Sequence, residues 1–201
     1  MAVNSPPFYF VRHGETDWNA ERRLQGQLDI PLNKVGRLQS AQCGSTLRSL
    51  IRARRKVPAD FAFFASPLSR ARETMEILRG GLDLPREGYA IEPRLAELSF
   101  GRWEGLTYAE VRALDHWALA VRERDKWNFT PPEGESYAEL LVRVRAWHAG
   151  VKGDIIVAAH GGVARVLMVL LGVRTPDDAP RGDVEQGVVY EFGPGVMKPH
   201  R

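Results

Sequence analysis

Cysteine is almost absent from this sequence, since Cys43 is the only one among 201 residues. A single cysteine excludes an internal disulfide and a cysteine-based zinc centre, and it agrees with a reducing compartment. A large excess of one charge is also missing, because the formal net charge is only +3. So small an excess does not indicate a nucleic-acid-binding protein. His116, His148 and His200 lack the spacing of metal ligands, so we assign them no role.

Long hydrophobic runs are missing as well. The longest, at 163–173, contains Arg165 and is too short to span a bilayer. Residues 1–14 lack the basic and apolar regions of a signal peptide. With 44% hydrophobic and 26% charged residues, the composition is that of an ordinary globular protein. We expect one domain over residues 1–201, cytoplasmic, without a membrane or nucleic-acid partner.

Apolar runs alternate with helical patterns along the chain. Runs at 8–11, 61–65, 154–159 and 188–192 predict buried strands, and a weaker strand at 91–95 is interrupted by Pro93. Helices are predicted at about 34–51, from Pro67 onward, and at 108–114, 136–151 and 162–172. This alternation is typical of an α/β protein with a largely parallel sheet.

Some local features are more specific. The helix from 34 is expected to bury one apolar face, made of Val35, Leu38, Ala41, Leu47, Leu50 and Ile51. Ser66 is expected to cap the following helix, with Pro67 at its first position. Residues 194–201 are expected to form a loose tail. The basic run from Arg48 to Lys56 is interpreted as a solvated helix end rather than a nucleic-acid patch, because no aromatic residues interleave it.

Ionisable residues follow three of the predicted strands. Arg12 and His13 come after the first, Arg70 comes shortly after the second, and His160 comes directly after the fourth. Because the carboxyl ends of parallel strands meet at one edge of a sheet, these side chains are expected to lie together. Two guanidinium groups and helix N-termini form a pocket for a tetrahedral dianion such as a phosphate group.

The histidines indicate the reaction. A neutral imidazole is a competent nucleophile at pH 7, and His13 is placed to attack phosphorus and form a phosphohistidine. The neighbouring cations would neutralise the phosphoryl oxygens during the transfer. The leaving alkoxide needs a proton, for which Glu97 is the first candidate donor and Glu104 the alternative.

Four motifs resemble those of the histidine phosphatase superfamily, also called the phosphoglycerate-mutase-like family. Residues 12–16 resemble its R-H-G-[ES]-T signature, and residues 66–74 its S-x-L-x-R-A-x-x-T motif. Residues 97–105 are similar to its E-x-x-F-G-x-W-E-G segment, and residues 159–162 to its second-histidine motif. The four motifs occur in the family's order, which makes the resemblance specific.

The resemblance implies a three-layer α/β/α sandwich with a mostly parallel central sheet, and a reaction without metal or cofactor. It implies that His13 is the phosphorylated nucleophile and that Glu97 is the proton donor. Arg12, Arg70 and His160 would complete the phosphate pocket. Asn19 looks like the family's additional phosphate contact, although it is equally suited to capping a turn.

The branch within the family is indicated by smaller differences. Gln25 and Gly26 stand where the mutases usually carry Thr-Gly or Ser-Gly, and Gly162 stands where they carry Asn. The patterns at 25–32 and 131–136 look like the phosphatase branch. We therefore favour a phosphatase for small phosphomonoesters, with Gln25, Gly26 and Gly161 as further substrate-binding residues.

Two alternatives remain open. One is phosphoryl transfer of the cofactor-dependent phosphoglycerate mutase type, and the other is a non-catalytic phosphate- or phosphoprotein-binding module. The alcohol portion of the substrate is expected to contact the segment 103–130. The sequence leaves the physiological substrate and the oligomeric state open, a homodimer included.

Overall fold

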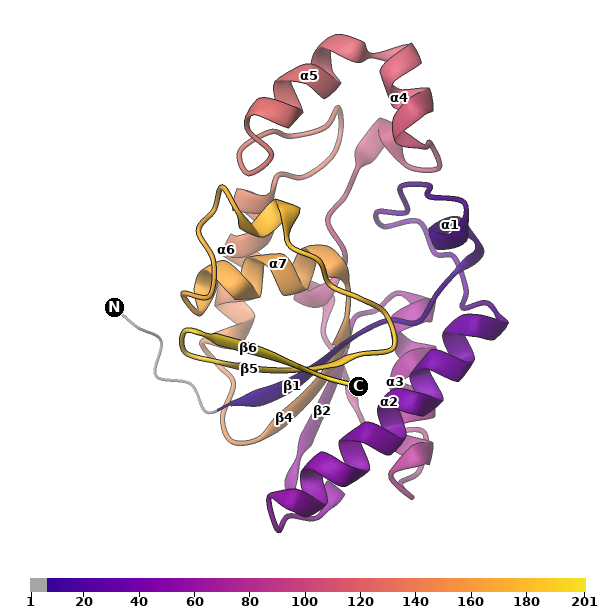
Figure 1. The fold of residues 1–201 in the computed structure, drawn as a ribbon, viewed down its shortest axis with the longest axis vertical. Coiled ribbons are helices and arrows are strands. Elements are labelled where there is room, and N and C mark those ends of the chain that lie inside the picture. Colours follow the sequence, from indigo (N-terminus) through magenta and orange to yellow (C-terminus); the bar gives the residue numbers. More distant parts are fainter. Residues whose placement is uncertain (1–6) are drawn as a thin grey trace.

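The computed structural model describes residues 7–201 (Figure 1). Residues 1–6, which belong to the stretch without a signal-peptide pattern, lie outside this description. A six-stranded sheet forms the centre, in the order β3-β2-β4-β1-β5-β6. The strands are β1 Phe8–Arg12, β2 Ala62–Ala65, β3 Ala90–Ile91, β4 Ile155–Ala159, β5 Val189–Gly193 and β6 Val196–His200. Within residues 7–201, no helix combines the length and apolarity that crossing a membrane requires.

The strand directions explain why the ionisable residues meet. Strands β3, β2, β4 and β1 run parallel, whereas β5 and β6 add two antiparallel pairings at one edge. Arg12 of β1 pairs with Ala159 of β4, so His13 and His160 follow side by side. Every residue of β4 is buried, as expected for a central strand covered on both faces.

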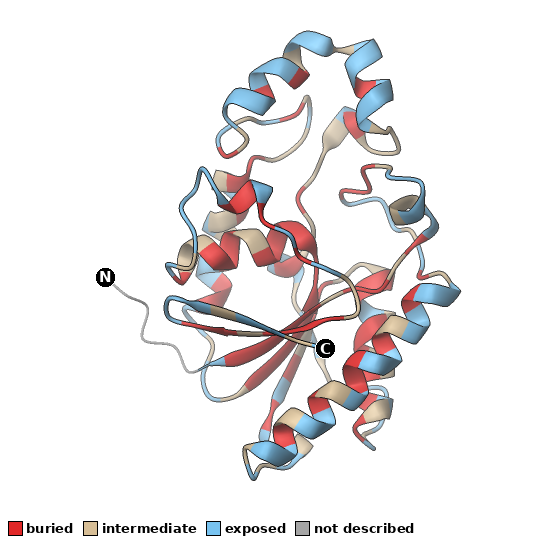
Figure 2. Cartoon of the chain, viewed as in Figure 1, coloured by how far each residue is buried: buried red, intermediate tan, exposed pale blue. Residues whose placement is uncertain are grey.

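Helices cover both faces of the sheet and produce three layers. Helices α2 Lys34–Ala53 and α3 Ser69–Gly81 lie on one face, and α6 Tyr137–His148 and α7 Gly161–Leu170 on the other (Figure 1). Because side chains alternate along a strand, Tyr9 joins the core under α2 and α3, whereas Phe8 and Phe10 join the core under α6 and α7. Figure 2 shows the buried strands between the two helical layers.

Shorter helices lie beyond the carboxyl ends of the parallel strands. They are α1 Asp17–Ala20, α4 Tyr108–Leu114 and α5 His116–Arg124, with 3-10 turns at η2 Pro93–Leu95, η3 Gly101–Trp103 and η4 Ala179–Arg181. A further 3-10 turn, η1 Pro58–Asp60, precedes β2 at its amino end. The sequence pattern did not predict α1 or α5. Helices α4 and α5 form a cap at the top of Figure 1 with a small core of their own, made of Leu24, Trp103, Val111 and Leu119.

The predicted apolar face of α2 is partly wrong. Val35, Leu38 and Ala41 face solvent, and the buried face consists of Gly36, Ser40, Cys43, Gly44, Leu47 and Ile51. Small residues are needed there because α3 packs very closely. A Cβ atom on Gly81 would lie 3.3 Å from the Cα of Gly44, which is closer than ordinary contact.

Two further predictions are wrong at the ends of elements. Helix α3 begins at Ser69, whose N–H donates to Asp29 Oδ1 at 2.7 Å, so Ser66 does not cap it. Residues 196–200 are not a loose tail, because they pair with β5 as strand β6. The Pro194-Gly195 turn joins the two strands, and Gly195 has a φ of 71°, which glycine adopts without strain.

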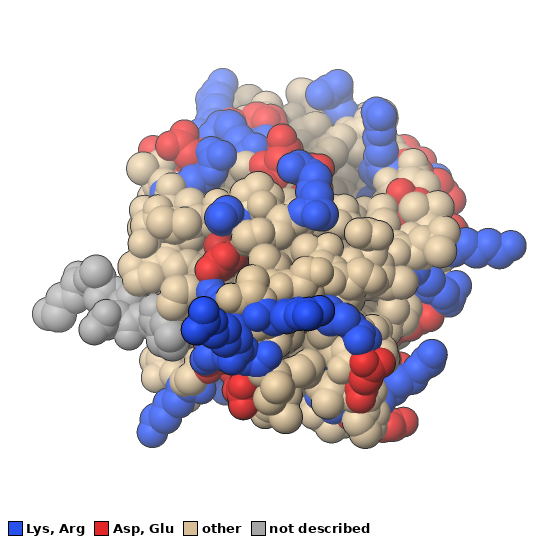
Figure 3. Space-filling view, turned by 60° about the horizontal axis from the view of Figure 1, so that its bottom comes forward, with Lys and Arg blue, Asp and Glu red and all other residues tan. Residues whose placement is uncertain are grey.

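Three residues of the basic run at the end of α2, Arg48, Arg54 and Lys56, are paired with acidic neighbours. Arg48 contacts Asp83 at 2.6 Å, and Lys56 forms an ion pair with Asp154. Figure 3 views this end of the molecule, where acidic side chains lie among the basic ones. The arrangement is that of an ion-paired helix terminus.

Candidate active site

A pocket of about 290 Å³ opens at the carboxyl ends of the parallel strands. Its wall contains eight of the nine residues predicted from the sequence: Arg12, His13, Asn19, Gln25, Gly26, Arg70, Glu97 and Gly161. The ninth, His160, is fully buried beside the pocket, and its ring centre lies 5.1 Å from that of His13. The structure therefore brings all nine residues together.

His13 is held in one tautomer. Its backbone N–H donates to Ala159 O at 2.9 Å, and its Nδ1 lies 2.7 Å from Gly14 O. A carbonyl oxygen only accepts hydrogen bonds, so Nδ1 carries the proton and Nε2 keeps a free lone pair. Burial, followed by the charges of Arg70 and Arg12, holds the pKa of His13 well below its usual value. The imidazole is therefore neutral at pH 7.

The loop that carries His13 packs backbone against backbone on α2. A Cβ atom on Gly14 would lie 2.2 Å from Gly36 O, and one on Gly36 would lie 2.1 Å from Glu15 O. The Gly14 N–H also donates to Thr74 Oγ1 of α3 at 3.1 Å. Helix α2 therefore holds the loop by direct backbone contact, and α3 holds it through the Thr74 side chain.

His160 is held by the strand next to its own. Its Nε2 lies 2.6 Å from Ser66 Oγ, at the end of β2. Burial and the charge of Arg70 hold the pKa of His160 well below its usual value, so it too is neutral. Ser66 thus orients a histidine instead of capping a helix.

The two predicted arginines are anchored through backbone carbonyls. Arg70 donates from Nη1 to Leu28 O at 2.8 Å and from Nη2 to Gly26 O at 2.7 Å. Arg12 donates from Nη1 to Val184 O at 2.8 Å. Burial, with the nearby charge of Arg165 next in importance, lowers the pKa of Arg12 to about 10, so Arg12 stays charged at pH 7.

Three buried nitrogens around the pocket have no hydrogen-bond partner among residues 7–201. They are Arg12 Nε, Arg70 Nε and His160 Nδ1. Buried polar groups are nearly always paired, and an unpaired one costs about 1–3 kcal/mol. Arg12 and Arg70 line the pocket and His160 lies beside it, so a bound anion would supply acceptors that the two guanidinium nitrogens lack.

The structure separates the two candidate proton donors. The Glu97 carboxylate lines the pocket and accepts from Gly162 N–H, at 3.1 Å and 3.2 Å to its two oxygens, and from Leu98 N–H at 2.8 Å. The Glu104 carboxylate lies outside the pocket wall and accepts from backbone N–H groups of Gln27 and Phe100, each at 3.0 Å. Glu97 is therefore the carboxylate that can reach a ligand in the pocket.

The remaining predicted residues support the pocket wall. Asn19 Oδ1 accepts from Thr16 N–H at 3.2 Å, so Asn19 completes the α1 cap and also lines the pocket. Gln25 Oε1 accepts from the Thr16 hydroxyl at 3.0 Å. A Cβ atom on Gly161 would lie 3.0 Å from Arg165 Nη1, so Gly161 leaves room for the guanidinium of Arg165.

Several wall residues were not among the predicted site residues, namely Arg23, Leu24, Leu98, Phe100, Tyr108, Arg122, Lys126, Tyr137, Gly162, Arg165 and Pro180. Of these, Tyr108, Arg122 and Lys126 lie in the segment 103–130 that was expected to contact the alcohol portion of the substrate. Arg165 stands four positions after Gly161 in α7, so helical spacing offered a signal for it. Arg122 is only 5% exposed, and its guanidinium lies 5.4 Å from the Tyr108 ring. Among residues 7–201, no cluster of three or more His, Cys, Asp or Glu is suited to hold a metal ion.

Comparisons with known proteins show the family to which the chain belongs. The sequence profile of the histidine phosphatase superfamily (branch 1) matches residues 8–195, so the chain belongs to this superfamily. A 2,3-bisphosphoglycerate-dependent phosphoglycerate mutase 2 of Gloeobacter violaceus is 28% identical over 189 residues, covering 90% of this chain and 83% of the relative. A glucosyl-3-phosphoglycerate phosphatase of Mycolicibacterium vanbaalenii is 33% identical over 177 residues, covering 81% and 73%.

A solved structure of a mycobacterial glucosyl-3-phosphoglycerate phosphatase superposes with a TM-score of 0.74 at 27% identity, covering 92% of this chain and 88% of the other. The predicted family and the predicted α/β fold class are confirmed. The phosphatases among these relatives support the prediction of a histidine-phosphatase-type enzyme, and mutases occur beside them.

Proposed function

We propose that the protein hydrolyses small phosphomonoesters through a phosphohistidine on His13, without a metal ion. The observation that carries this proposal is the free Nε2 of a neutral His13 in a pocket lined by Arg12 and Arg70, with His160 beside it. Within residues 7–201, each of these three side chains has a buried nitrogen without a hydrogen-bond partner. Such a pocket stabilises the charge on the phosphoryl oxygens while the nitrogen attacks.

The reaction has two steps. In the first, His13 Nε2 bonds to phosphorus, the bond to the ester oxygen breaks, and Glu97 gives its proton to that oxygen so that an alcohol leaves. In the second, water attacks phosphorus, the bond from nitrogen to phosphorus breaks, and Glu97 takes the proton from the water. Inorganic phosphate leaves and both residues return to their starting state.

The other predicted residues receive positioning and binding functions in this proposal. Arg12 and Arg70 hold the phosphoryl oxygens with His160, and Asn19 adds a contact at the α1 side. Gln25, Gly26 and Gly161 shape the wall, with Gly26 O anchoring Arg70.

The part of the pocket near the α4–α5 cap, here called the outer pocket, favours a phosphomonoester with a second anionic group. Arg122 and Lys126 of the α5 end line it and share one partner, the exposed Glu123, at 3.4 Å and 3.0 Å. One positive charge is therefore left over on this side. A carboxylate on the alcohol portion of the substrate would neutralise this positive charge. Phosphorylated hydroxy acids such as phosphoglycerate carry such a carboxylate, and phosphoglycerate appears in the names of both relatives.

A substrate panel with released phosphate as readout tests the proposal. We expect hydrolysis of several phosphomonoesters, with the highest kcat/KM on phosphorylated hydroxy acids. Arg122→Ala should remove this preference, and Arg124→Ala on the exposed face of α5 is its matched control. Interconversion of phosphoglycerates that requires 2,3-bisphosphoglycerate, with little phosphate release, would favour the mutase alternative. Failure to turn over any phosphomonoester would favour the binding module.

We also propose that residues 1–201 form one domain that acts on a small molecule in the cytoplasm, without nucleic-acid or membrane partners. The single sheet shared by both helical layers supports the proposal of one domain. The single cysteine supports the cytoplasmic location.

A further inference from the structure

The segment that carries Glu97 has little regular structure of its own. Glu97 lies between the 3-10 turns η2 and η3, in a stretch without helix or strand hydrogen bonds. A carboxylate that must protonate a leaving oxygen needs a fixed position, so neighbouring elements have to supply the support.

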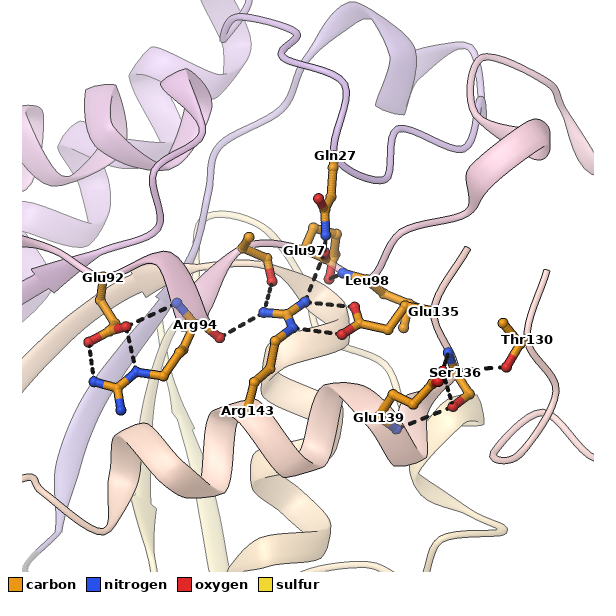
Figure 4. Close-up of polar contacts among 11 residues, drawn as sticks. Gln27, Glu92, Arg94, Glu97, Leu98, Thr130, Glu135, Ser136, Glu139 and Arg143 are labelled. Carbon is orange, nitrogen blue, oxygen red and sulfur yellow. Dashed lines mark hydrogen bonds and ion pairs between the residues drawn. The ribbon is translucent and has the colours of Figure 1, made fainter. Parts of the chain in front are cut away.

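Arg143 of α6 supplies most of this support (Figure 4). Its Nη1 donates to Arg94 O and Ala96 O, both at 2.7 Å, and its Nη2 donates to Glu97 O at 3.1 Å. Its Nε and Nη2 also bind the two carboxylate oxygens of Glu135, at 2.7 Å and 2.8 Å. All five N–H groups of the guanidinium are therefore used, three of them on the backbone just before and at Glu97.

The partner carboxylate ties the other side of the same segment to α6. The backbone N–H of Glu135 donates to Ser99 O at 2.9 Å. The first turn of α6 is closed by a capping box between Ser136 and Glu139, which holds Glu135 at the start of the helix. Arg143 and Glu135 thus grip residues 94–99 from both sides of Glu97.

We propose that Arg143 is a positioning residue, which sets where the Glu97 carboxylate stands through the backbone of residues 94–97. This inference rests on the proposed function, in which Glu97 protonates the leaving oxygen. Lysine cannot replace arginine here, because a point charge with three donors does not match five acceptors around a planar fork.

The test compares two substrates in three variants. Arg143→Met keeps the aliphatic stem, Arg143→Lys keeps the charge, and Arg145→Met is the matched control. Arg145 lies on the same helix, is exposed, and makes no side-chain hydrogen bond within residues 7–201. For both Arg143 variants, kcat/KM should fall about 10- to 100-fold on an alkyl phosphate and less than about threefold on nitrophenyl phosphate, whose leaving group needs little protonation. Arg145→Met should match the wild type.

A double-mutant cycle with Glu97→Gln separates a positioning effect of Arg143 from a general structural effect. The double variant Glu97→Gln with Arg143→Lys should lose no more activity on the alkyl phosphate than Glu97→Gln alone, because the proton donor is already gone. Equal losses on both substrates in the Arg143 variants, or losses that multiply in the double variant, would overturn the inference. Glu97→Gln acting equally on both substrates would instead overturn the proton donor in the proposed function.

Amide hydrogen exchange measures the position of the carboxylate without catalysis. Leu98 N–H and Gly162 N–H donate to the Glu97 carboxylate, so their exchange should accelerate about tenfold or more in Arg143→Lys and stay unchanged in Arg145→Met. Unchanged exchange in the Arg143 variant would refute its positioning function, whatever the activity shows.

Discussion

Replacement of Gly162 by alanine is expected to displace the Glu97 carboxylate without disturbing the fold. A Cβ atom at this position would lie 2.3 Å from Glu97 Oε1 and 3.2 Å from Leu98 Cβ. Ordinary contact begins near 3.4 Å, so the carboxylate must retreat by about 1 Å. A misplacement of about 1 Å costs roughly 100-fold in rate when a catalytic group must meet its target. Gly162 lies in α7 with ordinary helical backbone, so alanine introduces no strain there.

The assay is kcat/KM on an alkyl phosphate and on nitrophenyl phosphate, together with thermal unfolding. We expect Gly162→Ala to lose about 100-fold on the alkyl phosphate and much less on nitrophenyl phosphate. Gly80→Ala is the matched control, because no atom lies within 4 Å of a Cβ atom built there. Wild-type kcat/KM on the alkyl phosphate in Gly162→Ala would refute the placement of the proton donor against this helix.

Three other outcomes are expected. The wild type should yield an acid-labile, base-stable phosphoenzyme after rapid quenching, and His13→Ala should abolish both this species and turnover. A variant that still traps phosphate would contradict the assignment of the nucleophile. Chelators should leave activity intact, and a loss that zinc or magnesium restores would contradict the metal-free mechanism. His13 and His160 have pKa values below the unfolded value, so the free energy of unfolding should decrease as the pH falls below about 6.5. The decrease is about 1.4 kcal/mol per pH unit for each histidine, and urea midpoints that stay constant from pH 7 to pH 5.5 would contradict it.

The inner pocket could be predicted because its residues carry local signals. His13 and His160 each follow an apolar run, and an apolar run that ends in an ionisable residue marks the edge of a parallel sheet. Arg70 sits within the first turn of the next helix, where the chain returns to the same edge. These signals need no knowledge of distant contacts.

The outer part of the pocket, near Arg122 and Lys126, could be predicted only as part of the segment 103–130, and its individual residues and supports could not. Arg122 belongs to α5, whose small core with Trp103 and Val111 depends on contacts between segments far apart in the chain. Arg143 binds mainly carbonyl oxygens, and these are present at every residue, so the sequence holds no trace of which ones it contacts. Strand β6 contains Pro199, which is tolerated because β6 is the last strand of the sheet formed by residues 7–201.

The contact between Gly14 and Gly36 has a consequence for how this protein can change. The backbone of the His13 loop contacts the backbone of α2 directly at this point. No side chain can therefore change its rotamer to accommodate a shift of His13 relative to α2. Any substitution at this junction would move a whole helix, whereas substitutions in the α4–α5 cap alter only the surroundings of the departing alcohol. Substitutions that change the substrate preference are therefore expected in the α4–α5 cap, whereas Gly14 and Gly36 are expected to stay unchanged.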